Sequence, residues 1–133
     1  MALLAKVLEI ALGEADLSPS QYRLLNFLLE APAAATALAD RLDVTRPSLT
    51  ALVDGLVARG FVVREPDPDD RRRVSHQISD QGRAAAAKAD AAIQQRLGQL
   101  LTNLEPDDRV LASTGLERWL DAILAARANK ATS

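Results

Sequence analysis

Cysteine and histidine are the scarcest reactive groups in this 133-residue chain, which has no cysteine and only one histidine. Without cysteine, the chain can form neither disulfide bonds nor thiolate-ligated metal sites. With His76 as the only imidazole, most metal sites and acid–base pairs are hard to build, and no nucleophile–base pair stands out. We therefore expect no metal, no cofactor and no catalytic site, and the chain is not expected to be an enzyme.

Aromatic residues and long apolar runs are also rare. Aromatic residues make up 3% of the chain, whereas apolar residues make up 48%, and much of that is alanine. This composition favours closely packed helices over a β-sandwich. No apolar run approaches the roughly 20 residues of a membrane-spanning helix. The apolar N-terminal stretch carries Lys6 and Glu9 and lacks the basic lead of a signal peptide. We expect a single cytoplasmic domain without a membrane partner.

An excess of positive charge is missing as well. The net charge is −2, and residues 36–83 hold eight arginines, eight acidic residues and no lysine. A strongly basic nucleic-acid binder would show a clear positive excess. Any attraction to nucleic acid must therefore come from where the arginines are placed.

The clearest local pattern predicts a helix from Thr45 to Gly60. Thr45 is a good N-cap, Pro47 fits the first turn, and Gly60 suits a left-handed C-cap. One face repeats apolar residues at helical spacing: Leu49, Leu52, Val53, Leu56 and Val57. The opposite face begins with Arg46 and then three short side chains, Ser48, Thr50 and Ala51. A recognition helix places such N-terminal residues at base edges, although an ordinary amphipathic helix would show the same pattern.

A β-hairpin with a basic tip is predicted directly after this helix. Residues 61–64 are β-prone, and residues 74–79 alternate as a strand does. Between them, prolines and aspartates predict a turn-rich tip that ends in three arginines, residues 71–73. Beside a recognition helix, such a tip can reach phosphates or the minor groove. The alternative is a solvated turn that the neighbouring aspartates neutralise.

The sequence TRPSLTALVDGLVARGFVVREPDPDDRRRVSHQISDQG, from Thr45 to Gly82, resembles the MarR family of bacterial winged helix-turn-helix regulators without a gap. The resemblance implies that Asp70 fixes the wing and that Arg72 enters the minor groove. The chain departs from the usual family pattern at Ala51 and Gly55, where many relatives carry longer side chains. His76 stands where an aliphatic residue is common, and we expect it to be a half-buried residue of the sheet. The lack of cysteine excludes the thiol-based peroxide sensing of one branch of the family.

This resemblance implies a dimeric, DNA-binding transcriptional regulator that acts as a repressor and whose partner is a pseudo-palindromic, double-stranded operator. The expected DNA-binding residues are Arg46, Pro47, Ser48, Thr50, Ala51, Arg71, Arg72 and Arg73. The family also implies a small aromatic or amphipathic ligand, for which Tyr22 is a candidate, although a core tyrosine is more usual. The alternative is a winged-helix protein-interaction module that does not bind DNA.

The expected fold is mainly α with a small two-stranded β-wing, namely a winged helix-turn-helix plus a helical dimerisation layer. Further helices are predicted at residues 1–13, from Ser18 to Pro32, at 33–42, at 79–104 and from residue 105, with a fraying tail at 125–133. We expect a single domain, residues 1–133, with the DNA-binding lobe at 18–83 and the dimerisation region at 1–17 and 84–133. The expected dimerisation residues are Leu4, Leu8, Leu116, Trp119, Leu120 and Ile123.

Overall fold

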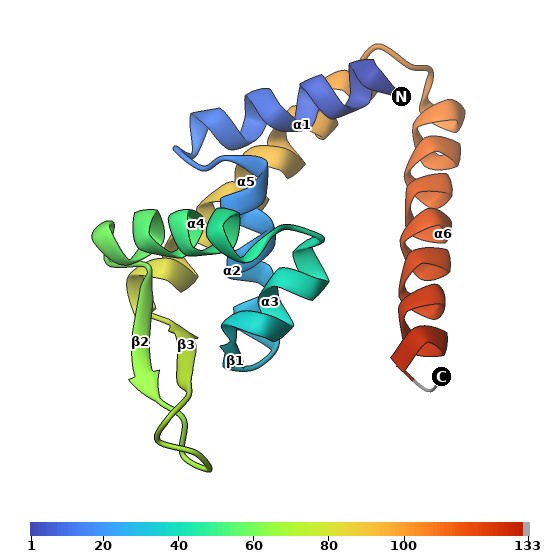
Figure 1. The fold of residues 1–133 in the computed structure, drawn as a ribbon. Coiled ribbons are helices and arrows are strands. Elements are labelled where there is room, and N and C mark those ends of the chain that lie inside the picture. Colours follow the sequence, from blue (N-terminus) through green and yellow to red (C-terminus); the bar gives the residue numbers. More distant parts are fainter. Residues whose placement is uncertain (132–133) are drawn as a thin grey trace. The chain divides into compact units, whose positions relative to one another are not determined.

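The computed structural model describes residues 1–131, which form two compact units, one from Met1 to Gln94 and one that begins at Gln95. Figure 1 shows the described elements, which in chain order are α1 (Ala2–Glu14), α2 (Pro19–Glu30), β1 (Ala33–Ala34), α3 (Ala35–Leu42), α4 (Arg46–Ala58), β2 (Val62–Pro66), β3 (Val74–Ile78), α5 (Asp80–Leu101) and α6 (Pro106–Ala131). The protein is mainly α-helical with one small antiparallel sheet, as the sequence predicts. Within residues 1–131, no helix has the length and apolarity needed to cross a membrane.

Helices α2 and α4 begin at the caps that the sequence predicts. Ser18 accepts the backbone N–H of Gln21, and the Gln21 side chain accepts the backbone N–H of Ser18, which completes a capping box. Thr45 Oγ1 accepts the backbone N–H of Ser48 at the start of α4. Gly60 follows α4 with a φ of 76°, a left-handed conformation that favours glycine.

The sheet has three strands rather than the expected two, in the order β1–β3–β2. Ala33 pairs with His76 and Ala34 pairs with Ser75, so β1 extends the hairpin on its inner side. The helix expected from residue 33 therefore begins two residues later, at Ala35. Alanine favours helices and gives no strand signal, and only the pairing with β3 sets this segment apart.

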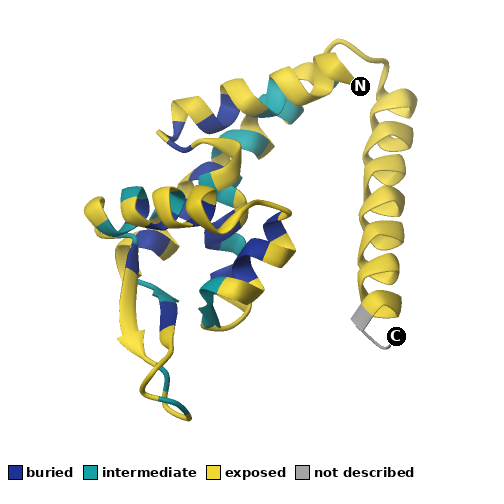
Figure 2. Cartoon of the chain, viewed as in Figure 1, coloured by how far each residue is buried: buried dark blue, intermediate teal, exposed yellow. Residues whose placement is uncertain are grey.

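Leucine dominates the core of the first unit, and alanine lets α5 pack closely onto it. The large side chains that are fully buried are Leu24, Leu25, Leu38, Leu49, Val53 and Leu56. Ala86 and Ala89 of α5 are both 0% exposed and belong to the same cluster. Figure 2 shows in dark blue that buried positions occur in the helices and strands of the first unit. Replacing one of the buried leucines by alanine would cost about 2–5 kcal/mol.

Ser79 and Gly82 join the base of the hairpin to the first turn of α5. Ser79 Oγ donates to the carbonyl of Gly60 at 2.5 Å and accepts the N–H of Gly82 at 3.0 Å. The N–H of Ser79 donates to the carbonyl of Phe61 at 3.0 Å. A Cβ at position 82 would lie 2.2 Å from that same carbonyl oxygen, so only glycine fits there. These contacts hold α4, β2 and α5 together at one point.

The last two helices differ in length from the expectation. α5 ends at Leu101 rather than at residue 104, and Thr102 donates its hydroxyl to the carbonyl of Gln99 at 2.6 Å. α6 continues to Ala131, so the expectation of a fraying tail from Ala125 is wrong for the described part of that segment. Residues 125–131 comprise four alanines, one arginine, one asparagine and one lysine, with no glycine or proline, and alanine, arginine and lysine are strong helix formers. The remainder of the expected tail, residues 132–133, lies outside the described residues.

Candidate nucleic-acid interface

The N-terminal half of α4 presents a polar, exposed surface. The expected contact residues of this helix are all exposed: Arg46, Pro47, Ser48, Thr50 and Ala51. Leu49, Val53 and Leu56 point the other way and are buried. The hydroxyl groups bond locally, because Thr45 Oγ1 donates to Ser48 Oγ at 3.0 Å and Thr50 Oγ1 donates to the carbonyl of Arg46 at 3.0 Å. The surface is therefore small and rigid, as a helix that enters a groove should be.

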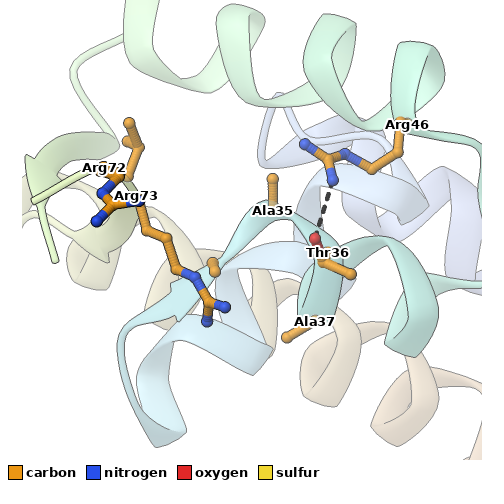
Figure 3. A pocket seen from close by; sticks show the side chains of 8 residues that line it. Ala35, Thr36, Ala37, Arg46, Arg72 and Arg73 are labelled. Carbon is orange, nitrogen blue, oxygen red and sulfur yellow. Dashed lines mark hydrogen bonds between the residues drawn. The ribbon is translucent and has the colours of Figure 1, made fainter. Parts of the chain in front are cut away.

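Arg46 is directed toward α3. Its Nη1 donates to Thr36 Oγ1 at 2.9 Å, and Figure 3 shows the guanidinium lying over the first turn of α3. Sequence reasoning did not single out Thr36, because a threonine in a run of alanines carries no motif. The contact holds the longest side chain of the exposed α4 surface against α3.

Asp70 shapes the tip of the wing. Its Oδ1 accepts the backbone N–H of Arg72 at 3.0 Å, and its carbonyl accepts the N–H of Arg73 at 3.0 Å. Asp67 supports the same turn, since its carboxylate accepts the N–H of Asp69 at 2.8 Å and its own N–H donates to the carbonyl of Arg73. These aspartates therefore serve the backbone of the turn more than they neutralise the arginines.

The arginine side chains of the wing project into solvent. The side chain of Arg72 is 95% exposed, and its Nε lies 4.0 Å from Asp70 Oδ1, beyond hydrogen-bond distance. Arg73 is 71% exposed and its Nε lies 3.9 Å from the other carboxylate oxygen of Asp70. Arg71 is exposed as well. A fixed backbone thus carries cations that are available for an anionic partner.

A cavity of about 590 Å³ lies between the wing, the start of α3 and the start of α4. It is lined by Ala34, Ala35, Thr36, Ala37, Arg46, Arg72, Arg73 and Val74. Figure 3 shows Arg46 on one side of this cavity and the wing arginines on the other. The cavity thus brings together residues from both parts of the expected DNA-binding surface.

One acid of α4 is paired with a strand. Asp54 forms an ion pair with Arg64 of β2, and Arg64 is the cross-strand neighbour of His76. The sequence analysis did not assign a role to Arg64, because a single arginine in a β-prone run has no distinguishing signal. The pair neutralises a carboxylate on the helix that is expected to approach DNA. It therefore shows how acids within residues 36–83 can be compatible with an anionic partner.

His76 is buried rather than half-buried, with 5% of its surface exposed, so that expectation is wrong. β3 is the central strand, and the added strand β1 covers a side that a two-stranded hairpin would leave open. The Nδ1 atom of His76 lies 3.1 Å from the carbonyl oxygen of Ala33. Burial lowers the pKa of His76 below its ordinary 6.5, and the charges of Arg64 and Arg46 act in the same direction.

Tyr22 connects α2 with α5. Its hydroxyl donates to Asp90 Oδ1, and Asn26 donates to the carbonyl of Tyr22 at 2.8 Å. Burial and, next, the hydrogen bond to Asp90 raise the pKa of Tyr22 to about 12. The Tyr22 hydroxyl therefore joins α2 to α5 through its hydrogen bond with Asp90.

The expected dimerisation residues lie on α1 and α6. On α1, Leu4 is 41% exposed and Leu8 is partly buried. On α6, Leu116, Trp119, Leu120 and Ile123 are 45%, 72%, 51% and 48% exposed. Figure 2 shows α6 exposed along its described length. Among the residues whose structure is described, no group of three or more histidines and carboxylates could hold a metal ion.

The comparisons with known proteins agree with this geometry. The profile of the MarR family matches residues 15–73. The chain is 33% identical over 121 residues to an uncharacterized HTH-type transcriptional regulator from Mycobacterium leprae. The matched stretch covers 90% of this chain and 85% of that protein. The chain is also 33% identical over 81 residues to the HTH-type transcriptional repressor YetL from Bacillus subtilis, covering 59% of this chain and 48% of the repressor.

Solved structures extend the likeness to the fold. The apo form of wild-type MarR from E. coli has a TM-score of 0.73 at 26% identity and covers 90% of both chains. The transcriptional repressor CouR, bound to a 23-mer DNA duplex, has a TM-score of 0.71 at 28% identity and covers 90% of this chain and 85% of its own. The relatives are regulators, a non-enzymatic role. The chain belongs to the MarR family of winged-helix, DNA-binding transcriptional regulators.

Proposed function

We propose that the protein is a homodimeric, sequence-specific transcriptional repressor whose binding to an operator is modulated by a small-molecule ligand. The observation that carries this proposal is the wing, where Asp70 holds the backbone while the Arg72 side chain stays 95% exposed. A protein that did not bind DNA would have little use for a fixed turn that presents three adjacent cations. The same observation argues against a winged-helix module that serves only protein contacts.

In the proposed complex, α4 enters the major groove and the wing reaches the adjacent minor groove. Ser48, Thr50 and Ala51 meet the base edges, with Pro47 beside them at the first turn of the helix. Arg72 enters the minor groove, where a narrow A·T-rich stretch has an enhanced negative potential. Arg71 and Arg73 contact phosphates on either side.

The exposed apolar side chains of the terminal helices support the proposed dimer. Large side chains such as Trp119 and Leu120 are more than half exposed on α6, and Leu4 is 41% exposed on α1. Exposed apolar surface of this kind marks an interaction site. We propose residues 18–83 as the DNA-binding lobe and residues 1–17 and 84–133 as the dimerisation region. A two-fold dimer would place two recognition helices ~34 Å apart, on a pseudo-palindrome.

The names of relatives support repression, and a cavity in the first unit supports control by a ligand. Two relatives, YetL and CouR, are named transcriptional repressors. For the ligand, the first unit has a second cavity of about 330 Å³, lined by Ala15, Asp16, Arg59, Phe61, Gln81, Ala84, Ala85 and Lys88. The Phe61 ring and the Lys88 amine suit a small aromatic anion. An aromatic acid that releases the wild type from DNA, and releases Lys88→Ala only at higher concentration, would support this site.

The test is binding of the purified protein to the DNA that flanks its own gene, across a salt series. We expect tight, salt-sensitive binding to a pseudo-palindrome. Arg72→Ala should weaken operator binding about tenfold or more without lowering the melting temperature, because Arg72 makes no folded-state hydrogen bond with its side chain. Arg23→Ala, which removes an exposed charge from α2, is the matched control and should leave binding unchanged. Equal affinity for the operator and for unrelated DNA would favour the protein-interaction module instead.

A further inference from the structure

We infer that Arg46, together with Thr36 and Arg73, binds a phosphate of the DNA backbone and does not read bases. The inference rests on the proposed function and assigns a specific role within its DNA-binding surface. It separates residues that set affinity from residues that set sequence preference. Three observations support it: the direction of Arg46, the composition of the cavity, and the side chains that remain on α4.

The first observation is the contact between Arg46 and Thr36. The guanidinium donates to Thr36 Oγ1 at 2.9 Å, so Thr36 holds it over the first turn of α3. A threonine oxygen that accepts one hydrogen bond can still donate its own O–H. The pair therefore offers an anion several donors from neighbouring positions, four N–H groups of the guanidinium and one hydroxyl. Reaching a base edge would require breaking this contact.

The second observation is the charge of the cavity. Its described lining includes three arginines, Arg46, Arg72 and Arg73, and no carboxylate. Asp70 is not among the lining residues. Its Oδ1 accepts the backbone N–H of Arg72, and its two carboxylate oxygens lie 4.0 Å and 3.9 Å from the Nε atoms of Arg72 and Arg73. Guanidinium groups bind phosphate oxygens through paired hydrogen bonds. Because the cavity opens between the wing and the helix pair, a backbone that runs from the minor to the major groove would pass it.

The third observation concerns what is left on α4 for base recognition. With Arg46 held by Thr36, the exposed side chains at the N-terminal end are short, and the Thr50 hydroxyl already donates to the carbonyl of Arg46. Serine and threonine can bond to base edges, and alanine can contact the thymine methyl group. These side chains would set the sequence preference without Arg46. Removing Arg46 should therefore lower the affinity for all DNA sequences and leave the order of their preference unchanged.

The experiment measures dissociation constants for a selected operator and for an unrelated duplex, each across a salt series. The proteins are the wild type, Arg46→Ala, Arg46→Lys and Thr36→Val, with Arg23→Ala as control. We expect Arg46→Ala to weaken binding to both DNAs by the same factor, about tenfold. The slope of log affinity against log salt concentration should fall in magnitude by about 1. Arg46→Lys should keep the slope but lose affinity. Thr36→Val should lose less affinity than Arg46→Ala and also keep the slope.

Several results would overturn the inference. One is a loss of operator binding in Arg46→Ala with no loss on unrelated DNA, which would make Arg46 a base-reading residue. Another is an unchanged salt slope in that variant. A third is competition by inorganic phosphate beyond that of chloride at equal ionic strength, combined with unchanged DNA binding by Arg46→Ala, which would assign the cavity to a free anion. Circular dichroism of each variant would show that it is folded.

A neutral methylphosphonate placed at single positions of the operator locates the contact. One such replacement should weaken the wild type and have no further effect on Arg46→Ala, because both changes remove the same interaction. Additive losses at every position would contradict the assignment. If the protein enriches no sequence from a pool of random duplexes, the proposed sequence-specific function fails. The salt dependence of binding to unrelated DNA would still test the role of Arg46 independently.

Discussion

The wing and α6 are both almost wholly exposed, but for opposite chemical reasons. The tip of the wing exposes cations on a backbone that Asp67 and Asp70 hold with hydrogen bonds. α6 exposes large apolar side chains, among them Trp119 at 72%. Exposed charge is well solvated and needs no cover, whereas exposed apolar surface gains about 25 cal/mol for each Å² that is removed from water. The wing is therefore stable in water without further contacts, whereas the proposed dimer would remove the apolar surface of α6 from water.

The largest effect should come from placing charge on α6. Trp119→Glu or Leu120→Glu should raise the dimer dissociation constant by about 30-fold or more, because a carboxylate would be buried at the proposed interface. Sedimentation analysis at micromolar concentrations measures the shift. Arg118→Ala is the neighbouring control, since it removes a polar side chain that pairs with Asp121 at 3.3 Å. A wild-type protein that sediments as a monomer would remove the basis of the comparison.

An intermediate effect is expected at the wing. Asp70→Ala removes the acceptor of the Arg72 N–H and should loosen the turn, which weakens operator binding several-fold while the melting temperature changes little. Asp69→Ala is the matched control. It also removes one negative charge, but Asp69 contributes to the turn through its backbone N–H, which the substitution keeps. If both variants lost equal affinity, net charge rather than turn geometry would explain the effect, and the wing would not be preorganised.

The smallest effect concerns acid. The unfolded chain protonates His76 near its ordinary pKa of 6.5, whereas the folded chain resists protonation because the pKa is lowered. The contribution of His76 to the free energy of unfolding is therefore fully present above about pH 6.5 and is lost as the pH falls below that value. The groups that face His76 are the carbonyl of Ala33 from β1, Arg64 from β2 and Arg46 from α4. Chemical denaturation at several pH values should show a weaker decline for His76→Gln, and an identical decline in both proteins would exclude this residue.

Prediction from sequence succeeded where local chemistry decides the structure. The N-caps Ser18 and Thr45 and the left-handed Gly60 follow from single residue types. The strand β1 and the contact between Thr36 and Arg46 depend on pairing across the fold, which no local pattern encodes. The burial of His76 was missed for the same reason, because it depends on β1. Which residues contact DNA and which form the dimer stays a prediction.

The contacts of Ser79 and Gly82 restrict bending at the base of the hairpin. Ser79 ties the end of α4 to the start of α5, and the backbone of Phe61 lies too close to Gly82 for either to slide. The wing and the helix it accompanies must therefore tilt as one block. In the proposed dimer, a ligand would then act by changing the distance or angle between the two recognition helices, because the wing and α4 of one chain would not bend separately.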